Sequence, residues 1–163
     1  MEVKEKIINK LGFNHRDKTQ LITELNLLIA SYHVHYQKLR NFHWNVEGNN
    51  FFELHEKFEE LYNFSKVNID NISERIRVFG DKPMASLQEY LDYSKITEPS
   101  GNQNADEMVK SILKDFEILI KQTIETLDIA NKIGDVSTID LLTNILKKTE
   151  KYFWMFRSYA SHN

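Results

Sequence analysis

The sequence predicts an all-α fold: four long helices in a bundle, with one short helix between the second and the third. Only five glycines and two prolines interrupt the 163 residues, and long stretches contain neither. Apolar residues recur at steps of three and four, which is the spacing of one helical face. The length fits one domain, so we expect residues 1–163 to form a single domain with residues 1–18 as a short N-terminal extension.

The first two long helices are predicted on either side of a polar turn. One runs to about Val46 and ends before Gly48, and the next begins near Phe51 and stops at Gly80. Their apolar faces are Leu21, Leu25, Leu28, Tyr32, Tyr36 and Leu39 in the first helix, and Leu54, Phe58, Leu61, Ile69, Ile72 and Ile76 in the second.

The short helix is predicted inside the longest connection of the chain. Ser86 and Glu89 have the spacing of a capping box, and the helix that they open ends at about Tyr93. A loop from 95 to 104 follows. A short helix at this place favours a crossover between parallel neighbours, and a plain up-down-up-down bundle is the alternative.

Two long helices complete the predicted bundle. The third runs from about Ala105 to Ile133, where Gly134 closes it, and a second capping box at Ser137 and Asp140 starts the fourth. Their apolar faces are Met108, Ile112, Phe116, Leu119, Thr123, Leu127 and Ala130 in the third, and Leu141, Ile145, Leu146, Phe153 and Phe156 in the fourth.

Four polar residues of the first two helices have the side chains of a metal site. His43, His55, Asp70 and Glu74 combine two imidazoles with two carboxylates, a set that suits iron, manganese or zinc. His55 and Asp70 are predicted on one continuous helix, which separates them by roughly 22 Å at 1.5 Å per residue. They cannot reach one ion from the same chain. If these residues form a site, two subunits must share it.

A helical wheel places the candidate ligands of the second helix beside its core face. With His55 at zero, Glu59 falls near +40°, Asp70 near +60° and Glu74 near +100°, while the apolar face lies between roughly −40° and −120°. If this helix pairs antiparallel with its own copy, His55 and Glu59 of one chain come opposite Asp70 and Glu74 of the other. A contact across a two-fold axis occurs twice, so a dimer would hold two equivalent sites. His43, from the end of the first helix, could complete each of them.

Each of these residues also has a purely structural interpretation. His43 could be a hydrogen-bonded core or interface histidine. Asp70 and Glu74 could form a solvated face near Arg75 and Arg77. Glu59 belongs to an acidic run that is ordinary for a surface, so spacing alone does not decide between the two interpretations.

Composition excludes several other classes of protein. The chain has no cysteine, so disulfides, thiolate chemistry and cysteine-based zinc sites are absent. A net charge of −3 gives no global attraction to nucleic acid or to an anionic membrane. No apolar run is long enough to cross a bilayer, and the first residues lack the apolar centre of a signal peptide. We therefore expect a soluble, cytoplasmic protein without a membrane partner.

Several separated motifs, in order along the chain, resemble the Dps family of mini-ferritins, the DNA-binding proteins from starved cells. The matching segments are Phe42-His43-Trp44-Asn45, Gly48 with Phe51-Phe52, Leu54-His55 with Phe58, Asp70 with Glu74-Arg75, Gly80-Asp-Lys-Pro83, and Trp154-Met155-Phe156. The resemblance covers nearly everything from about residue 11 to 159. It implies a ferritin-like four-helix bundle with the crossover connection.

The resemblance also implies a function. Twelve subunits would form a hollow homo-dodecamer that oxidises ferrous iron, preferentially with hydrogen peroxide, at dinuclear sites between two-fold-related subunits. The ferric mineral would be stored inside, which protects DNA from oxidative damage. His43 and His55 of one subunit, with Asp70 and Glu74 of its partner, match the iron ligands, and Glu59 matches a position that contacts a second iron. Zinc is a substitute metal, and a shell with an empty or zinc-filled centre is a further alternative.

Two more sets of residues follow from the resemblance. Trp44, beside His43, is expected either to donate an electron to a stray oxidant or to pack in the interface. Acidic residues near the start of the last helix line three-fold pores in the family. Asp135 and Asp140 match such positions and Asp128 lies nearby, while Asn131 and Val136 depart from the more acidic versions. Asp140 could instead cap its helix.

DNA binding and an association with the nucleoid stay open from the sequence. Family members that bind DNA often use a lysine-rich tail, and residues 1–18 carry a net charge of about +2 that twelve copies would multiply. Val3, Ile7, Ile8 and Leu11 instead suggest a short amphipathic helix docked on the shell, and the last residues offer no basic tail. A nucleoid-binding structural protein with secondary iron handling is therefore the alternative function.

Overall fold

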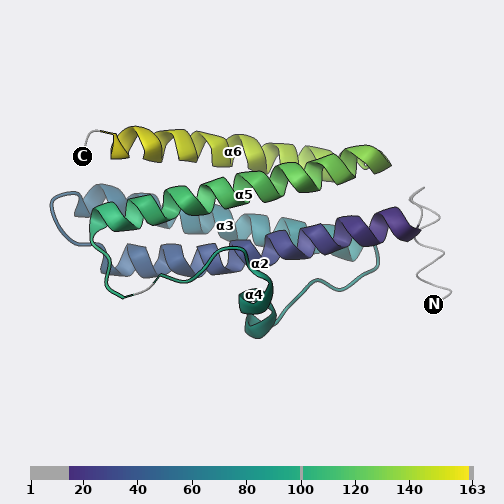
Figure 1. Cartoon of the computed structure of the whole chain (residues 1–163), viewed down its shortest axis with the longest axis horizontal. Helices are drawn as coiled ribbons and strands as arrows, with labels where there is room; N and C mark the ends of the chain where they lie inside the picture. Colours follow the sequence, from purple (N-terminus) through teal and green to yellow (C-terminus); the bar gives the residue numbers. More distant parts are fainter. Residues whose placement is uncertain (1–14, 100, 162–163) are drawn as a thin grey trace.

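The chain folds into four long helices that lie side by side, with one short helix outside them (Figure 1). The structure, a computed structural model, describes residues 15–99 and 101–161. The elements in chain order are α2 (His15–Asn45), α3 (Phe51–Val78), α4 (Leu87–Tyr93), α5 (Ala105–Ile133) and α6 (Val136–Ala160). Residues 15–18 already belong to α2 rather than to an extension. The rest of the predicted N-terminal segment lies outside the described residues.

The connection between α3 and α5 crosses the length of the bundle. Figure 1 shows α3 and α5 running in one direction and α2 and α6 in the other, with α4 inside the long connection. The crossover that the sequence favoured is confirmed, and the up-down-up-down alternative is wrong. This topology leaves α3 and α6 as antiparallel neighbours, which matters for the sites described below.

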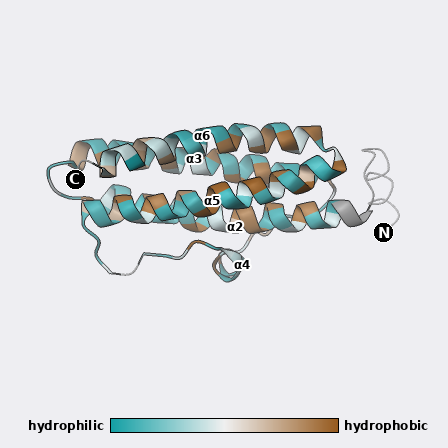
Figure 2. Cartoon of the chain, turned by 45° about the horizontal axis from the view of Figure 1, so that its top comes forward, coloured by the Kyte–Doolittle hydropathy of each residue, from teal (hydrophilic) through white to brown (hydrophobic). Residues whose placement is uncertain are grey.

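The predicted apolar faces form the interior. Figure 2 shows hydrophobic and hydrophilic segments alternating along each helix. Two clusters of buried side chains fill the bundle, one around Leu25, Ile29 and Ile72 and the other around Phe42 and Phe58. Burial of this apolar surface is the main force that holds the four helices together.

The buried face of α6 differs from the predicted one. Leu142 and Thr149 are fully buried, whereas Leu146 and Phe153 are only half-buried. The hydropathy pattern missed Thr149 because threonine counts as polar. Its hydroxyl donates to the carbonyl of Ile145 at 2.9 Å, so it enters the core without an unsatisfied donor.

The start of α6 also corrects the sequence analysis. The N-cap is Asp135, whose carboxylate accepts from the backbone N–H of Thr138 at 3.2 Å, and the predicted capping box at Ser137 and Asp140 is wrong. Gly134 adopts φ +71° and reverses the chain so sharply that the residue after it already caps the next helix. Asp140 is therefore free of any capping role.

Helices α4 and α5 both begin with a capping box, whereas Asn50 at the start of α3 makes no side-chain capping bond. Ser86 and Glu89 open α4 as predicted. Asn104 and Glu107 open α5 in the same way, which the sequence analysis did not identify. Each box satisfies backbone donors that a helix start otherwise leaves open.

Candidate metal centre

His43 and His55 lie against each other where α2 ends and α3 begins. The turn between the two helices is held by the backbone hydrogen bond from Phe51 to Gly48, where Gly48 adopts φ +104°. The two imidazole rings stack with their centroids 3.8 Å apart. His43 is 9% exposed and His55 is half-buried, so the pair lies just below the surface.

Reciprocal hydrogen bonds select one tautomer of each neutral imidazole ring. Nδ1 of His43 donates to the carbonyl of His55 at 2.8 Å, and Nδ1 of His55 donates to the carbonyl of His43 at the same distance. A carbonyl only accepts, so each Nδ1 carries a proton, and in the neutral ring Nε2 is the nitrogen that has a free lone pair. Two Nε2 atoms with fixed orientation are therefore available as ligands, and the backbone carbonyls act as the outer partners that metal-bound imidazoles require.

Aromatic rings support the histidine pair. Phe51 stacks on His55 with centroids 5.0 Å apart, and Tyr62 meets His43 edge-on at 5.4 Å. The pKa of Tyr62 is raised, first by partial burial and second by the nearby Glu59 carboxylate. These contacts restrict both imidazoles to one orientation.

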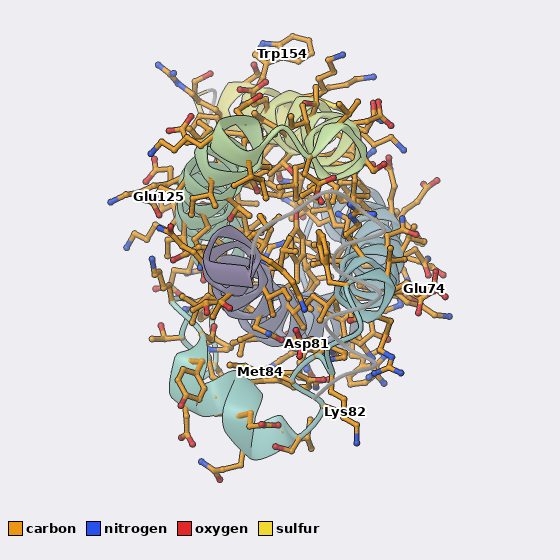
Figure 3. The ribbon with its side chains drawn as sticks, turned by 90° about the vertical axis from the view of Figure 1, so that its right-hand side faces the viewer. Glu74, Asp81, Lys82, Met84, Glu125 and Trp154 are labelled. Carbon is orange, nitrogen blue, oxygen red and sulfur yellow. The ribbon has the colours of Figure 1, made fainter. Side chains whose placement is uncertain are left out.

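The predicted carboxylate ligands lie on a different part of the surface from the histidine pair. Asp70 and Glu74 are exposed on the second half of α3, and Figure 3 shows Glu74 directed away from the bundle. Glu59 is also exposed, one turn after His55. In the described part of the chain, neither Asp70 nor Glu74 takes part in an ion pair.

One chain does not bring the predicted ligand set together. His55 and Asp70 are roughly 22 Å apart along α3, which is continuous from Phe51 to Val78. Across residues 15–99 and 101–161, no group of three or more histidine, aspartate or glutamate side chains is arranged to hold a metal. The structure thus separates the predicted ligands into two groups, the His43–His55 pair and the Asp70 and Glu74 carboxylates, and their assignment as metal ligands stays a prediction.

Trp44 and the pore candidates occupy different surroundings. Trp44 is 58% exposed, and the guanidinium of Arg40 lies 4.8 Å from its ring centroid. Asp128 and Asp140 are exposed. Asp135 is only 2% exposed and is held by Arg75 at 2.6 Å, so its carboxylate is already engaged inside the chain. Pore lining by these aspartates stays a prediction.

Two polar clusters were missed by the sequence analysis. Arg75 was considered as a partner of Glu74, but its guanidinium donates to Asp135 and to the hydroxyl of Thr138. Asp115 is buried between His35 at 2.9 Å and Lys38 at 2.7 Å. Both contacts join residues at least 60 positions apart, so no local pattern in the sequence could have indicated them.

The comparisons with known proteins agree with the fold. The pattern that defines the ferritin-like domain family matches residues 22–162. DNA protection during starvation protein 2 of Bacillus anthracis is 44% identical over 142 residues, 87% of this chain and 97% of that protein. The crystal structure of Dps from Staphylococcus aureus matches with a TM-score of 0.86 at 38% identity, covering 91% of this chain and 97% of the other.

A further solved structure adds a chemical description. Dps from Vibrio cholerae O1, described as a member of a broad superfamily of ferritin-like diiron-carboxylate proteins, matches with a TM-score of 0.87 at 33% identity. It covers 90% of this chain and 92% of its own. The fold and the family match therefore define a ferritin-like protein. Within that class, the chain belongs to the Dps family.

Proposed function

We propose that the protein is a ferroxidase and an iron store, in which ferrous iron is the substrate and hydrogen peroxide the preferred oxidant. The observation that carries this proposal is the reciprocal His43–His55 pair, which presents two free Nε2 atoms at the surface. A half-site with two ligands is incomplete. The exposed Asp70 and Glu74 are the complementary half, and membership of a diiron-carboxylate superfamily supports iron as the metal.

The two half-sites would meet when α3 pairs antiparallel with its copy. The wheel positions of His55, Asp70 and Glu74 put all three on one side of α3, beside the core face. An antiparallel two-fold contact then repeats the same set of ligands twice. Glu59, on the same side, would contact a second iron. Twelve such chains in a closed shell, with the mineral inside, is the assembly that we infer.

The proposed ligands explain why ferrous iron would be oxidised to ferric iron at this site. Neutral imidazoles accept an incoming ferrous ion, and carboxylates favour the ferric product. Two ferrous ions give one electron each, and hydrogen peroxide accepts both electrons as its O–O bond breaks. Its two oxygens end at the level of water or hydroxide. The electrons are taken in a pair, so no hydroxyl radical is released, which would protect nearby DNA.

A comparison of oxidants and variants tests the function. We expect the wild-type protein to oxidise ferrous iron faster with peroxide than with oxygen. A double variant, His43→Ala with Asp70→Ala, should lose most of the activity because both half-sites are damaged, on the order of a hundredfold for two lost metal ligands. Oxidation by the wild type that is no faster than by the double variant would defeat the proposal. Excess zinc should inhibit if it competes for the same ligands.

Direct DNA binding is not needed for this function. The lysine-rich segment lies mostly in residues 1–14, outside the described residues. A gel shift at several salt concentrations separates the alternatives, since a nucleoid-binding structural protein must retard DNA at low salt. No helix among the described residues could span a membrane. We propose a cytoplasmic location.

A further inference from the structure

The short helix α4 lies outside the four-helix bundle and buries little of its own surface. Figure 1 shows it in the long connection, apart from the four parallel rods of the bundle. Tyr90 is the one residue of α4 that is buried. Two apolar side chains of the same helix are open to solvent, with Leu87 79% and Leu91 51% exposed. The attachment of α4 to the bundle therefore depends mainly on one aromatic ring.

That ring stacks on a histidine of α2. The ring centroids of His33 and Tyr90 lie 3.7 Å apart, and the two planes are within 10° of parallel. His33 is half-buried, and this burial lowers the pKa of its imidazole from the ordinary value near 6.5. A protonated imidazole needs hydration that a stacked and half-buried ring cannot keep. The docked position of α4 therefore favours the neutral form of His33, and uptake of a proton favours the undocked position.

Charged side chains on the elements around the stack are engaged with other groups. They are Glu89 and Asp92 of α4, Lys95 after it, Lys121 and Glu125 of α5, and Arg40 of α2. The two carboxylates of α4 accept hydrogen bonds from their own helix or its N-cap, and both lysines pair with Glu125. Arg40 lies over two aromatic rings. None of these carboxylates forms an ion pair with the stacked histidine, so burial is what sets its preference for the neutral form.

Two hydrogen bonds tie the connection to α2 on either side of α4. The backbone N–H of Met84 donates to Oδ1 of Asn26 at 2.8 Å, and the backbone N–H of Lys95 donates to Oγ of Ser31 at 3.1 Å. Figure 3 shows Met84 where the connection meets α4. Amide and hydroxyl side chains keep the same charge throughout the pH range in which a histidine titrates, so both ties hold in either state. Movement is therefore limited to residues 85–94.

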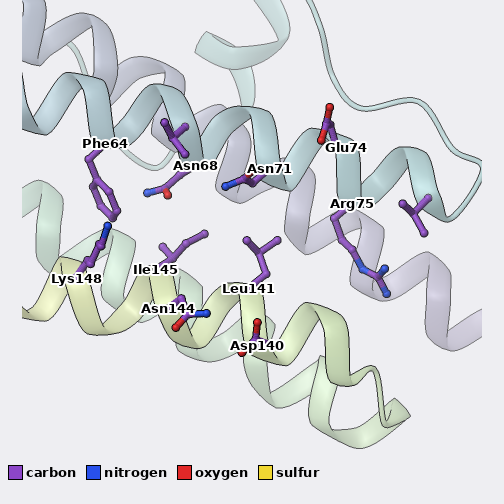
Figure 4. A pocket seen from close by; sticks show the side chains of 12 residues that line it. Phe64, Asn68, Asn71, Glu74, Arg75, Asp140, Leu141, Asn144, Ile145 and Lys148 are labelled. Carbon is purple, nitrogen blue, oxygen red and sulfur yellow. The ribbon is translucent and has the colours of Figure 1, made fainter.

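The bundle is held by contacts that do not involve α4. Figure 4 shows Phe64 of α3 and Lys148 of α6 pointing towards each other. Nζ of Lys148 lies 5.7 Å from the ring centroid of Phe64, and Nε of Arg75 donates to Oγ1 of Thr138 at 2.8 Å. Most of the buried apolar side chains also belong to the four long helices. The loss of one docked ring therefore leaves the core of the bundle in place.

We propose that α4 is a pH-operated switch: when His33 takes up a proton, Tyr90 leaves the stack and residues 85–94 separate from α2, while the four-helix bundle stays folded. This inference does not depend on the proposed function. Its consequence is local, because the released segment lies in the connection that joins α3 to α5. Acidification would expose the face of α2 that α4 covers.

Hydrogen exchange of the assembled protein, followed by mass spectrometry, tests the switch. The undocked form binds a proton near pH 6.5 and the docked form does so only at lower pH, so undocking should become about threefold to tenfold more frequent between pH 7.5 and pH 5.5. After correction for the intrinsic effect of pH on exchange, the amides of residues 87–93 should exchange faster by that factor, and those of α5 and α6 should not change.

Three results in the wild type would overturn the proposal. Equal exchange of residues 87–93 at the two pH values would show that proton uptake does not release α4. Slower exchange at pH 5.5 would show that a protonated His33 holds the Tyr90 ring more tightly, as a cation over an aromatic face. Faster exchange of α5 and α6 by the same factor would show that the whole bundle opens instead.

Variants of the two stacked rings supply the second readout. His33→Phe keeps an aromatic ring on Tyr90 but cannot take up a proton, so residues 87–93 should exchange equally at both pH values. Tyr90→Ala removes the anchor and should give fast exchange at both. Tyr93→Ala is the matched control, because Tyr93 belongs to the same helix but is 52% exposed, and it should keep the wild-type response to pH. A wild-type response in either His33→Phe or Tyr90→Ala overturns the proposal.

Discussion

At the residue scale, the surroundings of each histidine decide which of its ring nitrogens carries a proton and how readily the ring takes up a second one. The His43–His55 pair shows this, since two backbone carbonyls decide which nitrogen of each ring remains free. His33 illustrates a different effect. Its ring stacks on Tyr90 with centroids 3.7 Å apart, and burial lowers the pKa of this histidine. Protonation of His33 is therefore harder in the folded chain than in the unfolded one.

This lowered pKa predicts a pH dependence of stability. The unfolded chain takes up the proton near pH 6.5 and the folded chain only at lower pH, so His33 makes stability fall as the pH drops below about 6.5. His33→Phe keeps an aromatic ring on Tyr90 but removes the titration. We expect the thermal midpoint of the wild type to fall more between pH 7.5 and pH 5 than that of His33→Phe, at fixed protein concentration. Equal pH slopes in the two proteins would contradict this account.

At the scale of the elements, helix ends position the functional residues. The turn after α2 brings His43 to His55, and the turn after α5 puts Asp135 at the start of α6. Asp135 caps that helix and also accepts a hydrogen bond from Arg75 of α3, so one buried carboxylate joins α3 to the start of α6. Arg75 also donates to the hydroxyl of Thr138, so two contacts hold α3 against the first turn of α6.

The corrected helix start gives a direct comparison of two variants. Asp135→Ala removes a cap and leaves Arg75 without its partner, so we expect a loss of at least about 1 kcal/mol in the free energy of unfolding. Ser137→Ala should be almost neutral, because Ser137 is exposed and caps nothing. Thermal unfolding of both variants decides the matter. A larger loss of unfolding free energy for Ser137→Ala than for Asp135→Ala would contradict the cap at Asp135 and support the capping box expected from the sequence.

Much of the fold was predictable because its determinants are local. Periodic leucines such as Leu21, Leu25 and Leu28 define α2, and Ser86 with Glu89 defines the start of α4. The contacts that were missed are not local. Arg75 meets Asp135 only because α3 and α6 are neighbours in space. For the metal site, residue types and spacing indicated a candidate ligand set that would need a partner, and the family resemblance favoured it over a structural role. The reciprocal imidazole bonds became visible only in the structure.

At the scale of the whole molecule, our proposal makes the single chain incomplete on its own. The His43–His55 pair lies at one end of α3, and the exposed carboxylates of Asp70 and Glu74 lie towards the other. The chain also exposes large apolar side chains, including Phe52 (82%) and Trp154 (63%). Figure 3 shows Trp154 pointing outward from the bundle. Exposed apolar groups of this size mark contact surfaces, which agrees with function only in an assembly.

Subunit complementation tests this central claim most directly. One variant lacks the imidazoles (His43→Ala with His55→Ala), and the other lacks the carboxylates (Asp70→Ala with Glu74→Ala). Each alone should be inactive in ferrous iron oxidation. When both are unfolded together and reassembled at equal amounts, about a quarter of the sites should combine intact halves from two chains, because two-fold pairing is random. Recovery of about a quarter of wild-type activity is the predicted result. No recovery in mixed shells that have assembled fully would contradict the shared site.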